Sequence, residues 1–179
     1  MGNNPMEELF LVEPQEGYKE AFVKMVEEYG AVGEEYYFEM YKKALSDFKG
    51  YIQKLIEDRQ GCEGWVPTNT FWLTNTSGEI AGVVRIRMSL EHDYVKKYAG
   101  HIGYDIAPLS RKKGYGFTLL KLALEKAKRL QFDKVLLTCD DDNVASRRII
   151  EKNKGIFEST IMLNEKNKVL RRYWITLSD

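Results

Sequence analysis

Hydrophobic residues recur along this chain in two periods, and these predict both strands and helices. A short apolar run at residues 7–13 predicts a first strand, which Pro14 ends. Steps of three or four between apolar residues predict helices over 18–30 and 33–61, with Gly50 as a point where the second helix breaks or bends. A two-residue alternation then predicts strands over 70–75 and 80–90.

The second half of the chain predicts a strand, helix and strand in direct succession. Apolar runs at 100–108 and 134–139 flank a helical pattern at 115–130, which is the order of a parallel crossover. A short helix then begins with the capping residues Asp142 and Asn143 and stops near Gly155, and 156–164 and 169–177 predict a hairpin. We therefore expect one α/β domain over residues 1–179, with a mixed sheet and one parallel pair near its middle.

Composition narrows the function classes. The chain carries 27 basic and 27 acidic residues, and this balance argues against a general nucleic-acid binder. It has no apolar run of the roughly 20 residues that cross a bilayer, and its first ten residues lack the pattern of a signal peptide, so we expect a cytoplasmic protein without a membrane partner. Cys62 and Cys139 lack metal-site spacing, and the acidic run 140–142 heads a helix, so we expect no metal.

The densest positive charge of the chain lies at the start of the helix at 115–130. Arg111, Lys112 and Lys113 run into Gly114 and Gly116. A helix N-terminus offers unpaired amides and a partial positive charge, and glycine allows a close approach, so this loop predicts a pyrophosphate cradle. The loop lacks the Gly-Lys-Ser/Thr of the Walker motif and the third glycine of the dinucleotide fingerprint, although a nucleotide-phosphate binder of another kind stays open.

The loop and its surroundings resemble the acetyl-CoA motif of the GNAT superfamily of N-acetyltransferases. "GHIGYDIAPLSRKKGYGFTLLKLALEKAK" is similar to the central motif of that family, and "VLLTCDDDNVASRRIIEKN" to the segment after it, in particular to a bacterial branch of predicted acetyltransferases. The resemblance implies an acyl-CoA N-acyltransferase fold with a splayed, mostly antiparallel central sheet. It also implies transfer of an acetyl group from acetyl-CoA to a primary amine of a small molecule or peptide, by direct attack in a ternary complex. It leaves a homodimer open.

Acetyl-CoA contacts carry over by position onto the strand before the loop, the loop itself, the first helical turn and the start of the next helix. The residues implied are Ile106, Ala107, Arg111, Lys112, Lys113, Gly114, Tyr115, Gly116, Thr118, Asn143 and Ser146. Ile106 and Ala107 would offer main-chain groups to pantetheine, and the loop would bind the pyrophosphate mainly through its amides.

Catalytic residues are less clearly indicated. Relatives often use a Tyr seven residues after the helix-starting Asn to protonate the leaving thiolate, and this chain has Ile150 there. Tyr104 shares a strand face with Ile106 and is a candidate acid, or else a core aromatic. His101 titrates near neutrality and is a candidate base, or else a structural histidine; alternation places it with Asp105 on the opposite face.

Arg85 and Arg87 share one face of the strand at 80–90, near the expected acceptor groove. They are candidates for binding a carboxylate or phosphate of the acceptor, or else solvated strand arginines. Because Ile150 removes the usual hydroxyl, an acetyl-CoA-binding sensor or pseudoenzyme without acceptor turnover is the alternative function. The sequence does not identify the acceptor.

Overall fold

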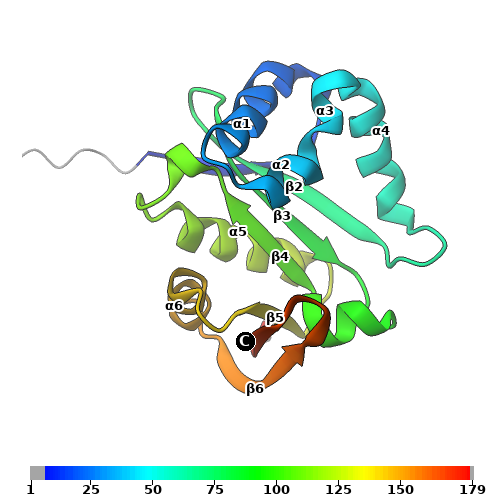
Figure 1. The fold of residues 1–179 in the computed structure, drawn as a ribbon, viewed down its shortest axis with the longest axis vertical. Helices are drawn as coiled ribbons and strands as arrows, with labels where there is room; N and C mark the ends of the chain where they lie inside the picture. The colour runs from blue at the N-terminus through cyan, green and yellow to red at the C-terminus, as the bar shows by residue number, and fades with distance from the viewer. Residues whose placement is uncertain (1–6, 178–179) are drawn as a thin grey trace, which may run out of the picture.

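The computed structural model describes residues 7–177, whose strands form one seven-stranded sheet (Figure 1). In chain order the strands are β1 (Leu9–Val12), β2 (Thr68–Asn75), β3 (Ile80–Arg87), β4 (Ile102–Ile106), β5 (Lys134–Asp140), β6 (Ile156–Leu163) and β7 (Lys168–Thr176). They lie in the order β1-β2-β3-β4-β5-β7-β6, and β4–β5 is the one parallel pair among them. The predicted mixed sheet with a central parallel pair is confirmed.

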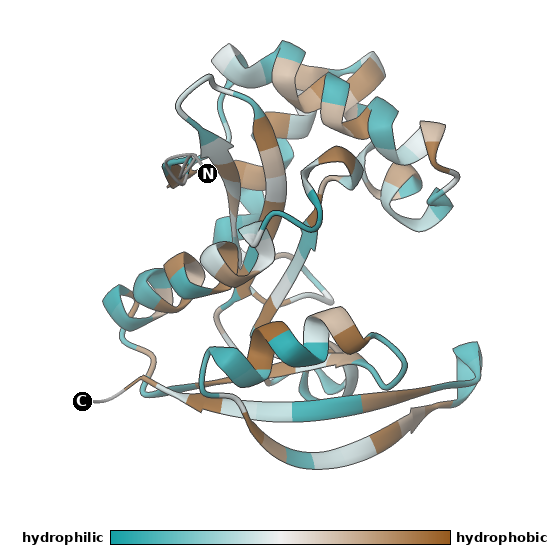
Figure 2. Cartoon of the chain, turned by 90° about the vertical axis from the view of Figure 1, so that its left-hand side faces the viewer, coloured by the Kyte–Doolittle hydropathy of each residue, from teal (hydrophilic) through white to brown (hydrophobic). Residues whose placement is uncertain are grey.

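Helices cover both faces of the sheet, and two apolar cores follow from this. The bounds are α1 (Lys19–Ala31), α2 (Glu35–Tyr41), α3 (Lys43–Ser46), α4 (Phe48–Glu57), α5 (Tyr115–Arg129) and α6 (Val144–Lys152). Buried residues of α1–α4 pack against Trp72 and Val83, whereas α5 and α6 pack against alternate residues of the same strands, such as Phe71 and Val84. Figure 2 shows hydrophobic and hydrophilic residues following one another along these helices, as two-sided elements require.

The predicted helix over 33–61 is divided into α2, α3 and α4. Asp47 has an extended φ of −144° and caps α4, because its carboxylate accepts a hydrogen bond from the Gly50 amide at 2.9 Å. A Cβ on Gly50 would lie 2.1 Å from that carboxylate. Gly50 therefore lies inside α4 and allows the cap to form, and the break occurs three residues earlier than expected.

The structure does not describe the two ends of the chain. Residues 1–6, on which part of the argument against a signal peptide rests, and residues 178–179 lie outside the described part of the chain. Within 7–177, no helix is long and apolar enough to cross a membrane. A single π-helical turn at Val95–Ala99, which the sequence pattern does not predict, joins β3 to β4.

The parallel strands β4 and β5 meet only where β4 begins, at the middle of β5. The His101 amide donates to the Leu136 carbonyl at 2.7 Å, Gly100 forms a bridge with Leu137, and Ile102 is the one β4 residue in register with β5. Gly100 has a φ of +66°, and a Cβ there would lie 2.5 Å from the Leu136 carbonyl oxygen. Glycine thus allows the close contact, and beyond it the strands part while β4 stays paired with β3 over five positions.

A buried ionic network fastens α1 and α2 to the centre of the sheet. The Asp105 carboxylate accepts hydrogen bonds from the Tyr29 and Tyr41 hydroxyls, both at 2.7 Å, and from Arg85 at 2.6 Å. The Asp105 side chain is 1% exposed. Burial raises the pKa of both tyrosines well above the ordinary value, so they stay protonated as donors. These three donors give both oxygens of the carboxylate a hydrogen-bond partner, as a buried charge requires.

Removing one partner of this network should destabilise the fold strongly. Arg85→Met leaves the Asp105 charge buried with two neutral donors, and we expect a loss of about 3–5 kcal/mol in the free energy of unfolding. Arg59→Met is the matched control, since it breaks an exposed pair with Glu13 and should cost about 0–1 kcal/mol. Urea unfolding at pH 7 measures both, and equal losses would contradict this account of the network.

Candidate functional site

The parting of β4 from β5 leaves main-chain groups of β4 facing an open gap. The His101 carbonyl and the Ala107 amide bond to β3, at Arg87 and Ala81. Because the hydrogen-bonding direction alternates along a strand, the intervening residues Tyr104 and Ile106 turn their amides and carbonyls toward β5. Beyond Ile102 no β5 residue is in register to pair with them. This edge can therefore accept an extended ligand that continues the sheet.

Ala107 does not share this property. Its amide donates to the Ala81 carbonyl, and its own carbonyl accepts from the Ser110 amide, both at 2.9 Å. Both main-chain groups of Ala107 thus have partners within the protein, whereas the Ile106 amide faces the gap and the Ile106 carbonyl also accepts from Arg111 Nε at 3.0 Å.

The loop after β4 ends the gap with a row of free amides. In the described part of the chain, no acceptor is found for the main-chain amides of residues 112–116, and the first hydrogen bonds of α5 run from Phe117 and Thr118 to the Gly114 carbonyl. Lys112 and Gly114 have φ values of +61° and +83°, and these left-handed residues curl the loop. Successive amides in such a curl form an anion-binding concavity at the helix N-terminus.

The cationic side chains of the loop do not converge on that concavity. Arg111 forms a two-armed ion pair with Glu34 at the start of α2, and its Nε donates to the Ile106 carbonyl at 3.0 Å. The Lys113 ammonium lies 5.7 Å from the centre of the Tyr115 ring, and Tyr115 donates to Glu7. The predicted charge is present, but its direct contribution at the amides is smaller than three converging cations would give.

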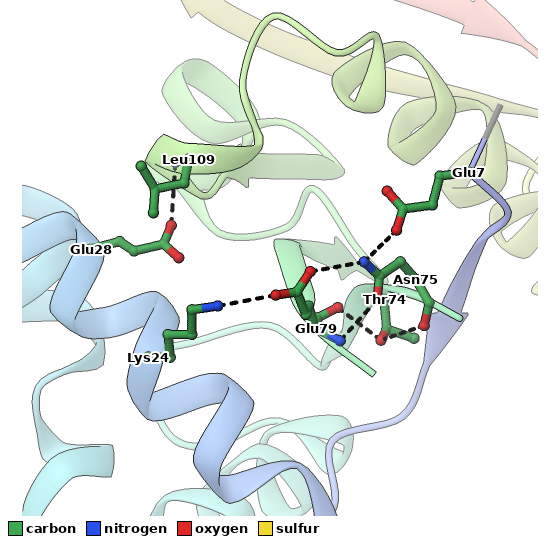
Figure 3. Close-up of polar contacts among 7 residues, drawn as sticks. All are labelled: Glu7, Lys24, Glu28, Thr74, Asn75, Glu79 and Leu109. Atoms are coloured by element: carbon green, nitrogen blue, oxygen red, sulfur yellow. Dashed lines mark hydrogen bonds and ion pairs between the residues drawn. The ribbon is translucent and has the colours of Figure 1, made fainter. Parts of the chain in front are cut away.

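Lys113 also lines a hollow of about 300 Å³, between α1 and the β2–β3 turn. Figure 3 shows the polar contacts beside it: Lys24 pairs with Glu79 at 3.0 Å, and Glu28 accepts from the Leu109 amide at 3.3 Å. The last contact ties α1 to the short turn that carries the cationic loop. This hollow lies on the α1 side of the loop, and the contact between Glu28 and the Leu109 amide beside it positions the loop.

Gly116 has a packing reason that the motif alone did not suggest. A Cβ at this position would lie 2.6 Å from the Ile149 side chain of α6. The glycine lets α6 pack closely against the first turn of α5, so the two helices enclose the same side of the gap. Thr118 is half-buried in that first turn.

Tyr104 and Ser146 meet across the gap, as the alternation of β4 and the capping of α6 require. The Tyr104 hydroxyl and the Ser146 Oγ are 3.0 Å apart, and Asn143 caps α6 by accepting from the Ser146 amide at 3.0 Å. Burial raises the pKa of Tyr104 to about 12. The tyrosine therefore keeps its proton near neutral pH and can donate it, but it does not serve as a base there.

These residues line a cavity of about 570 Å³ that opens toward the α2 face. Its wall comes from the start of α2, the π-helical turn, β4, β5, α6 and the β6–β7 hairpin, and it includes Glu34, Glu35, Tyr36, Tyr37, Tyr94, Tyr98, Tyr104, Thr138, Asn143, Ser146 and Lys166. The sequence did not single out the tyrosines of α2 and of the π-helical turn, because helical spacing predicts core packing for those of α2 and no helical or strand pattern covers the segment that forms the π-helical turn. In the described residues, no group of three or more His, Cys, Asp or Glu side chains could hold a metal ion.

His101 lies away from this cavity. It is 8% exposed, its Nδ1 accepts from the Leu136 amide at 2.9 Å, and its ring packs against Phe132 and Trp174. Burial lowers the pKa of His101 to about 4, and the Arg87 charge adds to this effect. The structure does not bring His101 together with Tyr104 or Asp105, so the geometry supports the structural reading of this histidine.

The two candidate acceptor-binding arginines have different surroundings. Arg85 is held by Asp105 and donates to the Tyr41 hydroxyl at 2.6 Å, so its charge is already compensated within the core. Arg87 donates to the Ala99 and Gly100 carbonyls at 3.4 and 3.2 Å and pairs with no carboxylate in the described residues. Ile150, at the position where the family resemblance led us to expect a tyrosine, lies on α6 itself and is fully buried in the core.

Comparison with known proteins gives a consistent picture. The family model described as "Acetyltransferase (GNAT) family" matches residues 34–156. No protein with a curated description matches the sequence significantly. Among solved structures, RimL, a ribosomal L7/L12 alpha-N-protein acetyltransferase in complex with coenzyme A, is 20% identical with a TM-score of 0.69, covering 96% of each chain.

Two further structures are similar over nearly their whole length. The microcin C7 self-immunity acetyltransferase MccE, in complex with acetyl-CoA and AMP, is 16% identical with a TM-score of 0.71 and 97% coverage of each chain. A chimera of the spermidine N-acetyltransferase SpeG from Vibrio cholerae and hSSAT is 17% identical with a TM-score of 0.59, covering 94% of this chain and 95% of that one. These likenesses establish the fold.

The environment of His101 predicts a pH-dependent stability term. Its pKa is near 6.5 when unfolded and about 4 when folded, so the folded state resists protonation. The free energy of unfolding should be unaffected by this group above pH 6.5 and should fall by about 1–3 kcal/mol as the pH drops toward 4. His101→Asn, which keeps an acceptor for the Leu136 amide, removes this term. Urea unfolding of both proteins from pH 7 to 4 tests it, and parallel pH profiles would count against it.

Proposed function

The chain belongs to the GNAT family of acetyltransferases, and on that premise we propose that it transfers the acetyl group of acetyl-CoA to a primary amine by direct attack in a ternary complex. The observation that carries this proposal is the gap between β4 and β5, with the free edge of β4 along it and the free amides of residues 112–116 at its end. A long, thin ligand with a diphosphate fits this combination, because its amide-bearing arm can pair with the strand while the phosphates meet the amides.

In this proposal, the groups that contact the cofactor follow one another along the gap. Tyr104 and Ile106 offer main-chain groups to the pantetheine arm, and residues 112–116 bind the pyrophosphate through their amides. Asn143 and Ser146 lie on the opposite wall, and Thr118 lies one turn into α5. Arg111 shapes the loop through Glu34 and the Ile106 carbonyl, and its side chain contributes less to the phosphates than its position in the motif implies.

Tyr104 supplies the hydroxyl that Ile150 does not. In the transfer the amine nitrogen forms a bond to the thioester carbonyl carbon, the carbon–sulfur bond breaks, and the leaving thiolate takes up a proton. The attacking nitrogen releases a proton to solvent, from which the donor is reprotonated. Tyr104 is protonated near neutral pH, lies in the cavity and is oriented by Ser146, so it is the donor best placed for this step. We do not assign the role of proton acceptor to His101, since its Nδ1 already accepts a hydrogen bond from the Leu136 amide.

An amine-acceptor screen with detection of released CoA thiol tests the proposed function directly. Acceptor-dependent thiol release with mass-spectrometric detection of the acetylated amine is the expected result. Tight acetyl-CoA binding without release across primary amines, polyamines, amino acids and peptide N-termini would favour the sensor alternative, for which the buried Ile150 is the supporting observation.

Gly114 gives a sharp test of the pyrophosphate contact. Gly114→Asp places a carboxylate at the free amides and should raise the Kd for CoA about tenfold to a hundredfold, or about 1.4–2.8 kcal/mol. Gly114→Asn is the matched control, because asparagine tolerates the positive φ of +83° and adds no charge. Isothermal titration calorimetry measures the affinities. Wild-type affinity in the Asp variant would be incompatible with phosphates at this loop.

Tyr104→Phe tests the proton donor. We expect kcat to fall on the order of a hundredfold while the Kd for acetyl-CoA changes little, since the ring and the main chain remain. Tyr98→Phe removes a hydroxyl from the same cavity without touching Ser146 and should leave kcat near the wild-type value. The assignment fails if both variants lose activity equally, or if Tyr104→Phe turns over normally.

A further inference from the structure

Arg87 is a largely buried cation that lacks a counter-ion. Its Nη1 donates to two main-chain carbonyls, its Nε is buried without a partner, and none of its nitrogens lies within ion-pair distance of a carboxylate in residues 7–177. Burial lowers the pKa of Arg87 to about 10, and the nearby Arg85 charge adds to this effect. The side chain still carries its charge at neutral pH, so the protein keeps a positive charge that its own groups do not balance.

The backbone next to Arg87 leaves room for the guanidinium. A Cβ on Gly103 would lie 3.2 Å from Nη2 and 3.3 Å from Nη1, so the group lies across this glycine. Nη2 has no partner among the described residues, and unlike Nε it is not a fully buried atom. It therefore retains access from outside. Nη2 is thus the nitrogen that can donate a hydrogen bond to a carboxylate or phosphate, whereas Nε stays buried.

Arg87 lies beside the cavity that contains Tyr104. It ends β3, and its Nη1 donates to the carbonyls of Ala99 and Gly100, at the end of the π-helical turn whose Tyr94 and Tyr98 line that cavity. Some charged groups of the wall are compensated: Glu34 pairs with Arg111, and Asp140 pairs with Lys168. Glu35 and Lys166 also line the wall and form no ion pair within the described residues, and Lys166 lies over the Tyr36 ring.

We propose that Arg87 binds an anionic group of the acceptor, so that the acceptors of this enzyme are primary amines that also carry a carboxylate or a phosphate. The inference rests on the proposed function, because it assigns the acceptor to the cavity in which Tyr104 and Ser146 lie. A fixed, poorly hydrated guanidinium gains more from an anion than an exposed lysine does, since its desolvation cost is already part of the folded state.

Matched acceptors that differ only in charge test this class. Wild-type enzyme is assayed with amino acids and their carboxamides, and with aminoalkyl phosphates and the corresponding amino alcohols. We expect kcat/KM to favour the anionic member by at least about tenfold, a factor equivalent to about 1.4 kcal/mol. Comparing the carboxylate pairs with the phosphate pairs then decides which anion the site prefers.

Variants assign the preference to a residue. Arg87→Gln should reduce the ratio of kcat/KM for the anionic and neutral members to about one, and Arg87→Lys should restore part of it. Lys166→Gln is the control for the second cation and should keep the full preference. Calorimetric CoA affinity and thermal melting of each variant show whether it is folded. If Arg87→Gln does not fold, Arg87→Lys alone still tests the site, because the loss of the guanidinium should reduce the preference.

The outcomes separate this inference from the proposed function. Turnover without any preference for anionic amines, or a preference lost in Lys166→Gln and kept in Arg87→Gln, would overturn the inference and leave the acetyltransferase activity standing. A second readout does not need turnover: calorimetry of N-acetylated amino acids and their amides with the CoA-bound protein. Arg87-dependent binding of the acid in an enzyme that turns over no amine would support the anion site and count against the proposed function.

Discussion

The separation of β4 from β5 is the constraint on which the rest of the structure depends. Gly100 brings the two backbones into contact, and the strands then diverge after one residue in register. A sheet interior normally satisfies its main-chain groups, so an unpaired edge in the middle of seven strands is costly unless a ligand completes it. The free edge of β4 and the free amides of residues 112–116 adjoin one another, and this continuity defines the place for a long ligand with an anionic end.

A polar network and a close contact between two helices position the walls of this gap. On the α2 side, Asp105 binds Tyr29, Tyr41 and Arg85, which fixes α1 and α2 to β3 and β4 at the centre of the sheet. On the opposite side, Gly116 lets α6 pack against α5 and so positions the helix that carries Ser146. The cavity between these walls is lined by Tyr104 and by tyrosines of α2 and the π-helical turn. The proposed proton donor Tyr104 and the proposed acceptor-binding residue Arg87 lie on the neighbouring strands β4 and β3.

Local sequence signals predicted the elements, and the resemblance to the GNAT superfamily implied the gap, but neither predicted the partners of single side chains. Period-two alternation placed Tyr104 with Ile106, and the glycines with the helix start predicted the free amides. These signals could not distinguish the surroundings of Arg85 from those of Arg87, because the groups that neutralise Arg85 come from α2 and β4, which are distant in sequence. Likewise, His101 was expected to share a face with Asp105, but its ring lies against Phe132 and Trp174, which depends on the crossing of β4 and β5.

A crystal structure of the protein with bound coenzyme A tests the central claim most directly. The account predicts that the pantetheine arm lies between β4 and β5, hydrogen-bonded to the main chain of Tyr104 and Ile106, with the diphosphate oxygens within hydrogen-bond distance of the amides of residues 112–116. A complex in which the diphosphate binds elsewhere, with β4 and β5 closed against each other beyond Ile102, would contradict it.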